Sequence, residues 1–188
     1  MTLTDFVLGR RAPRRARSDL IAGIVAARRG LEMDLDVRAA ALVFEPCGVS
    51  GDATVERELD ALLAGIAEDT GAEVAQREDG FGLRWVTLSG GSLDDLALSI
   101  GVLAESLRLA GQWPQLVCAV FVFHKGGDPT ARVFWIYSFE RGTFYPFVPR
   151  DDARRDCEEE ARLWAAVEDD LRLEHDPQRW YPLWGIPI

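Results

Sequence analysis

The sequence predicts an α+β fold, an antiparallel sheet of about five to six strands packed with three to four helices as a layered sandwich. Residues 54–70 and 92–110 repeat apolar side chains at helical spacing. Residues 115–124 form a nearly continuous apolar run rich in β-branched and aromatic side chains, which is typical of a strand buried on both faces. Short strand-like segments joined by glycine-containing turns favour antiparallel pairing.

Two helices are predicted from their apolar stripes and their ends. Residues 54–70 place large apolar side chains at i, i+4, i+7, i+8 and i+11, and Gly71 follows where a left-handed residue commonly ends a helix. The next helix begins at Ser92, and Asp95 completes the spacing of a capping box. Its inward stripe comprises Leu93, Leu96, Ala97, Ile100, Leu103 and Leu107.

Two further helices are placed near the ends of the chain. Ser18 can cap a helix that runs toward Gly30. The last helix, over about residues 152–171, begins with acids that the helix dipole favours at this end. We expect its inward side chains to be Cys157, Ala161, Trp164 and Leu171.

The first strands are short. Residues 39–44 form a strand that ends before Pro46. Asp79-Gly80 is placed to turn a hairpin between residues 73–77 and 81–88, since this dipeptide tolerates positive φ.

A second hairpin is predicted to occupy the centre of the sheet. Its strands are residues 115–124 and 132–139, joined through Gly126-Gly127-Asp128-Pro129. Residues 143–148 return as a further strand, which Pro146 marks as an edge because proline cannot donate to the ladder.

The chain is expected to form one domain with an arm. Residues 1–17 are the basic and apolar arm, and residues 18–188 are a single α+β domain with an aromatic C-terminal tail. Separate packing of residues 1–50 is the alternative. The sequence contains no apolar run long enough for a membrane span and no export signal, and its three cysteines are scattered. These features favour a cytoplasmic location.

Charge divides the arm from the body. The net charge is −10, but the first 30 residues carry seven arginines and two aspartates, so they hold +5 and the rest of the chain −15. An acidic body excludes general nucleic-acid binding. A helical arm would resemble a weak interfacial anchor at the inner face of the membrane, and a disordered solubilising arm is the alternative. The candidate membrane contacts are Leu3, Phe6, Val7, Arg10, Arg11, Arg14 and Arg15.

No catalytic, cofactor or metal site is expected. His124 and His175 lack partners at metal-ligand spacing, and the consecutive acids at residues 158–160 point in different directions on a helix, as on a solvated face. Cys157 with His175 and Asp176 has the residue types of a thiol triad, but its expected burial among acids favours a structural cysteine. Gly126-Gly127 lacks the Gly-Lys-Ser/Thr ending of a phosphate loop.

Aromatic residues gather near the end of the chain, where they serve either packing or recognition. We expect the two segments that carry them, residues 143–149 and 180–187, to lie close together and to contribute to one surface, because prolines prevent them from continuing a ladder or a helix. The interaction candidates are Phe144, Tyr145, Phe147, Trp180, Tyr181 and Trp184.

Three segments read WPQLVC from Trp113, RGTFYPFVP from Arg141 and RWYPLWGIP from Arg179. Together they resemble the PspA-associated protein PspAB family, and LGR from Leu8 is similar too. The resemblance implies a small accessory of the phage-shock-type envelope stress system, whose gene tends to lie beside those for PspA-like proteins or the membrane protease HtpX. It supplies no catalytic residues.

The leading interpretation is therefore a non-enzymatic protein that binds a PspA-like or HtpX-like partner. The alternative is a small-molecule or peptide-binding module with an apolar pocket between sheet and helices. An enzyme with an unrecognised acid/base pair is a third hypothesis.

Overall fold

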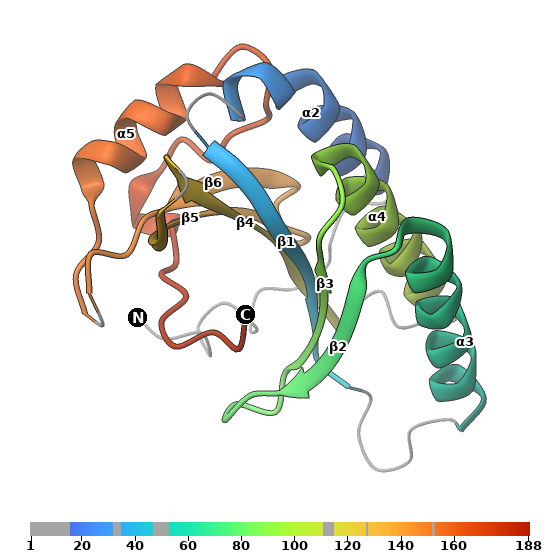
Figure 1. The fold of residues 1–188 in the computed structure, drawn as a ribbon. Coiled ribbons are helices and arrows are strands. Elements are labelled where there is room, and N and C mark those ends of the chain that lie inside the picture. The colour runs from blue at the N-terminus through green and yellow to red at the C-terminus, as the bar shows by residue number, and fades with distance from the viewer. Residues whose placement is uncertain (1–15, 32–34, 47–52, 111–114, 127, 152) are drawn as a thin grey trace.

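Two ten-residue strands form the middle of the fold. The computed structural model describes residues 16–31, 35–46, 53–110, 115–126, 128–151 and 153–188 (Figure 1). In it, β1 (Leu35–Phe44) pairs antiparallel with β4 (Leu116–Lys125). The sheet has the order β2-β3-β1-β4-β5-β6, and every neighbouring pair is antiparallel. The other strands are β2 (Glu73–Glu78), β3 (Arg84–Ser89), β5 (Asp128–Ser138) and β6 (Thr143–Phe147).

The helices cover one face of this sheet, which we call the helix face (Figure 1). Alternate side chains of the central strands point into this layer, as the two-residue period of a strand requires. Phe121, Phe123 and Trp135 are among the largest side chains there, and all are fully buried. The covering helices are α2 (Ala16–Leu31), α3 (Ala53–Thr70), α4 (Leu93–Leu109) and α5 (Cys157–Ala166).

Helix α4 begins with the predicted capping box. The Ser92 hydroxyl oxygen accepts the Asp95 backbone N–H at 3.2 Å, and the Asp95 carboxylate accepts the Ser92 backbone N–H at 3.3 Å. All six side chains of the predicted stripe are buried. Helix α2 packs alongside α4, and its Arg28 bonds Asp94 at 2.8 Å.

The opposite face of the sheet is also apolar, and we call it the tail face. Val43, Val120 and Ile136 are buried on it. The end of the chain crosses this side as a segment without regular structure, residues 180–188, which we call the C-terminal tail (Figure 1). A 3₁₀ turn, η2 (Pro177–Arg179), leads into it.

The predicted fold class is confirmed, but the position of one strand is corrected. We expected the hairpin of β4 and β5 to be the centre, whereas β1 pairs along nearly the whole of β4 on its other side. The first part of β1 was not predicted because Asp36 and Arg38 are polar. The pairing of β1 with β4 also shifts register between Val37 and Ala39. Residues 35–44 therefore belong to the main sheet rather than to a separate unit.

The last helix is shorter and turned differently from the prediction. It inserts Glu160 and Leu163 into the protein, whereas Cys157 and Ala161 are exposed. The expectation of a buried Cys157 was wrong because the acidic residue Glu160 occupies an inward position. Apolar residues at helical spacing cannot indicate that an acid points inward. Within the run 158–160, expected to be solvated, Glu160 is only 1% exposed.

The first hairpin turns through Asp79 rather than through Gly80. The Asp79 carboxylate accepts the backbone N–H groups of Phe81 and Leu83 at 2.8 and 3.0 Å, and the Trp85 indole N–H at 2.8 Å. The left-handed residue is Gly82, with φ of 79°. The turn is consequently longer than the two-residue turn that the Asp-Gly pair suggested.

Burial of Val120 predicts that an acid there prevents folding. The side chain is 0% exposed in the central strand, and an unpaired buried charge costs several kcal/mol against a total stability of about 5–15 kcal/mol. Val120→Asp should therefore show no cooperative melting by circular dichroism. Leu98→Asp is the control, since Leu98 is 54% exposed on α4. A soluble Val120→Asp protein with a normal transition would contradict the buried position of β4.

Candidate interaction surface

Three of the six aromatic interaction candidates lie in the core. Phe144 is 1% exposed on the helix face, and Tyr145 and Phe147 are buried on the tail face. Adjacent residues of β6 alternate between the two faces, which is why one short segment contributes to both layers. Their burial favours the packing role that the sequence left open.

The other three candidates belong to the C-terminal tail and are half-buried. Trp180, Tyr181 and Trp184 pack against the tail-face cluster. The Trp184 ring meets Phe147 edge-on with centroids 4.9 Å apart, and the Tyr145 hydroxyl donates to the Tyr181 carbonyl at 3.3 Å. The two aromatic segments lie close together, as predicted. They do not contribute to one surface, because Phe144 lies on the helix face and the tail packs on the other face.

An ion pair between half-buried Arg155 and buried Glu160 anchors the start of the tail. Arg155 Nε lies 2.7 Å from Glu160 Oε2, and Arg155 Nη1 donates to the Trp180 carbonyl at 2.7 Å. The same carboxylate accepts the Val148 backbone N–H at 2.8 Å. Burial raises the pKa of Glu160, and the bonds from Val148 and Arg155 oppose that rise. This one arginine thus connects α5, the end of β6 and the tail.

A second arginine holds the tail from the other side. Arg141 Nη2 donates to the Arg179 carbonyl at 3.3 Å, and its guanidinium lies 5.2 Å from the Tyr181 ring centroid. Its Nε lies 3.3 Å from a carboxylate oxygen of Glu174. Because the tail runs without a strand partner, these side chains satisfy carbonyls that a ladder would otherwise bind.

The other sequence candidates do not converge. Cys157 is exposed at the start of α5, and the Trp164 ring packs edge-on against His175. In the part of the chain that the structure describes, no group of three or more histidine, cysteine or acidic side chains could hold a metal ion. The seven membrane-contact candidates lie outside the described residues. None of the described helices is long and apolar enough to span a membrane.

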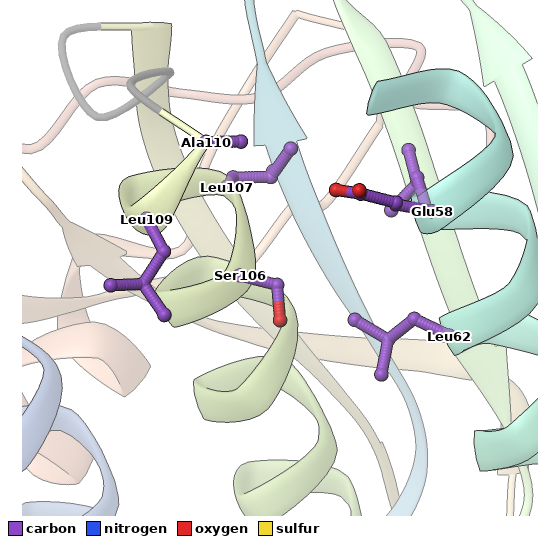
Figure 2. Close-up of a pocket in the computed structure, with 7 residues that line it drawn as sticks. Glu58, Leu62, Ser106, Leu107, Leu109 and Ala110 are labelled. Atoms are coloured by element: carbon purple, nitrogen blue, oxygen red, sulfur yellow. The ribbon is translucent and has the colours of Figure 1, made fainter. Parts of the chain in front are cut away.

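An open groove between α3 and α4 is a surface feature that the sequence did not reveal (Figure 2). Its volume is about 360 Å³. Glu58 and Leu62 point from α3 toward the last turns of α4 (Figure 2). Its lining residues are Glu58, Leu59, Leu62, Ser106, Leu107, Leu109 and Ala110.

The groove has a buried floor and exposed sides. Leu59 and Leu107 are buried and belong to the core, whereas Leu62 is half-buried and Leu109 is 72% exposed. Leu62 was predicted on the inward stripe, and Leu109 lies off the stripe of its helix. The position of Leu109, outside the apolar stripe at the end of α4, was the sequence feature that could have indicated this groove. Large exposed aliphatic side chains beside a hollow are typical of protein-binding surfaces.

The tail contacts predict that Trp184 contributes to stability. Trp184→Ala should lower the free energy of unfolding by about 2 kcal/mol, less than for a fully buried tryptophan, while capture of a protein partner per folded molecule stays unchanged. Phe81→Ala is the control, since Phe81 is 67% exposed. Urea denaturation measures the first effect. Weakened capture at unchanged stability would instead make Trp184 a contact residue.

The buried pair predicts a pH-dependent effect of Arg155→Ala. The variant leaves the Glu160 carboxylate buried without its partner, which costs about 3–5 kcal/mol. Losing the arginine raises the pKa of Glu160 further. As the pH falls toward that pKa, protonation of the carboxylate therefore restores part of the lost stability. Urea denaturation should show that the variant loses more unfolding free energy, relative to the natural protein, at pH 7 than at pH 5.

Arg154→Ala is the matched control for Arg155→Ala. Arg154 is exposed, and its pair with Asp151 lies on the surface, so its removal should cost less than about 1 kcal/mol. Equal losses in the two variants, or a deficit of Arg155→Ala that does not change with pH, would contradict the anchoring role.

Comparison with known proteins identifies the family. The family model of PspA associated protein B matches residues 1–188. Neither curated proteins nor solved structures gave a match. The family name implies association with PspA in a phage-shock-type system. The chain belongs to the PspA associated protein B (PspAB) family.

Proposed function

We propose that this protein is a non-enzymatic accessory of a phage-shock-type membrane stress response and that it acts by binding a PspA-like protein. Family membership supports the class of partner. The groove between α3 and α4 supports the mode of action, since it offers half-buried Leu62 and exposed Leu109 on either side of an apolar floor. An HtpX-like membrane protease is the second partner that we propose for the same surface.

The groove favours a protein partner over the alternative of an enclosed small ligand. It opens to the surface, whereas the space beneath the tail, between Trp85, Cys118 and Leu183, cannot admit a water molecule. Between sheet and helices, bulky Phe121, Phe123 and Trp135 fill the core. A ligand pocket normally encloses most of its ligand, and an open apolar groove suits the side chains of a partner.

The proposed place of action is the cytoplasmic side of the membrane. Contact with the membrane would pass through the PspA-like partner, with the basic arm of residues 1–17 adding a weak attraction to anionic lipid. The charge of −14 on residues 18–188 opposes closer approach to such a surface.

The groove generates a direct test of this proposal. Leu62→Glu and Leu109→Glu should each weaken binding to the PspA-like protein of the same organism by about 2 kcal/mol, roughly 30-fold, as expected when a central apolar contact is lost. Isothermal titration calorimetry with purified proteins gives the dissociation constants. The HtpX-like protein is titrated in a parallel series.

Leu98→Glu is the matched control, because Leu98 is an exposed leucine of α4 that does not line the groove. Its binding should stay within twofold of the natural protein. Unchanged binding in all three variants would reject the groove as the docking site, and absence of any binding by the natural protein would reject the PspA-like partner.

A further inference from the structure

The charges around the α3–α4 groove restrict the chemistry of its partner. Glu58 is the charged residue of the lining, and among the described residues it forms no ion pair. Residues 56–70 of α3 carry five acids and a single arginine. Of these acids only Glu58 lies in the lining, because Glu56 pairs with Arg84 and Asp60 accepts a hydrogen bond from Gln76. The negative charge beside the apolar hollow is therefore that of Glu58.

The basic side chains beside the groove are already engaged. Arg108 of α4 binds Glu105 through two bonds of 2.7 Å, and Arg84 of β3 binds Glu56 with a shortest contact of 2.6 Å. The Ser106 hydroxyl donates to the Val102 carbonyl at 3.0 Å within its own helix. Glu58 is thus the polar group of the lining that an incoming cation can reach and pair with.

The backbone of the groove favours a helix over an extended peptide. Its sides are helices, and the carbonyls left open at the end of α4 belong to a helical turn, so the groove offers no strand edge for pairing. An extended segment would bury its own N–H and C=O groups without partners, whereas a helix satisfies its own. The lining residues Glu58 to Leu62 and Ser106 to Ala110 each span about one helical turn, or about 6 Å. Two apolar side chains at i and i+4 match this length.

We propose that the groove binds an amphipathic helix of its protein partner, with a large aliphatic pair at i and i+4 and a lysine or arginine flank. The aliphatic pair lies on Leu59 and Leu107 between Leu62 and Leu109, and the basic flank pairs with Glu58. This inference rests on the proposed function, because it assigns the chemistry of the partner to the same groove. It corresponds to the helix-in-groove mode of recognition.

Two designed peptides test the inference without requiring the natural partner. Both are helices of about 18 residues with the same leucine ridge, one flanked by lysines and the other by glutamates. Fluorescence anisotropy measures their binding to the full chain. The lysine peptide should bind at least about tenfold more tightly, and Leu62→Glu should weaken its binding by at least about tenfold.

Charge variants separate pairing in the groove from attraction to an acidic protein. Glu58→Gln should weaken binding of the lysine peptide about threefold to tenfold. Glu168→Gln removes the same charge beyond α5, outside the groove lining, and should change binding less than twofold. Equal losses in the two variants, equal binding of the two peptides, or no binding of the lysine peptide would each overturn the inference.

The outcomes also distinguish this inference from the proposed function. If Leu62→Glu weakens binding of the PspA-like protein but Glu58→Gln does not, the docking site stands and the basic flank is rejected. If the PspA-like protein does not bind at all, the proposed function fails, and the peptide pair still decides the chemistry of the groove.

Discussion

The structure depends on a central strand pair that is apolar on both faces. β1 and β4 are hydrogen-bonded to each other and to β3 and β5, so their backbone groups have partners. Their apolar side chains must be buried by other segments on both faces of the sheet. Each fully buried large side chain contributes about 1.5–3 kcal/mol. Helices provide one layer of cover by their apolar stripes. The aromatic tail contributes to the other, which explains why the chain ends in tryptophans, leucine and isoleucines.

Cover by an irregular segment requires its own backbone partners. Prolines at 182 and 187 prevent the tail from pairing as a strand. The side chains of Arg155 and Tyr145 bind its carbonyls instead, and Arg141 binds the carbonyl of Arg179 just before it. Arg155 is itself held by the buried Glu160. The pair of half-buried Arg155 and buried Glu160 thus fixes the position of an apolar cover. Contacts around the two groups partly offset the cost of burying Glu160: it bonds Arg155 and Val148, and Arg155 contacts Trp180 and Phe147.

Sequence reasoning recovered the parts of the fold in which local signals agree with tertiary packing. Helix α4 has a capping box and an unbroken stripe, and Pro146 marks β6 as an edge. It failed where a polar residue takes an inward position, as with Glu160, or where polar residues begin a strand, as in β1. The groove was beyond its reach, because the space between two helices depends on how they diverge over the sheet. The aromatic residues were identified from the sequence. Their division between the core and the half-buried tail could not be predicted, because it depends on how the side chains of β6 alternate between the two faces of the sheet.

We assign stability and recognition to different parts of the protein. The aromatic tail belongs to the packing of the tail face, and the α3–α4 groove is the surface proposed for the partner helix. Site-specific photo-crosslinking of the full chain to the PspA-like protein tests this division directly, with the photoreactive residue placed at 62, at 98 or at 184 in turn. We expect crosslinks from position 62 that fall on a single helix of the partner, and few from positions 98 and 184. Crosslinks concentrated at position 184, with none from position 62, would contradict this division.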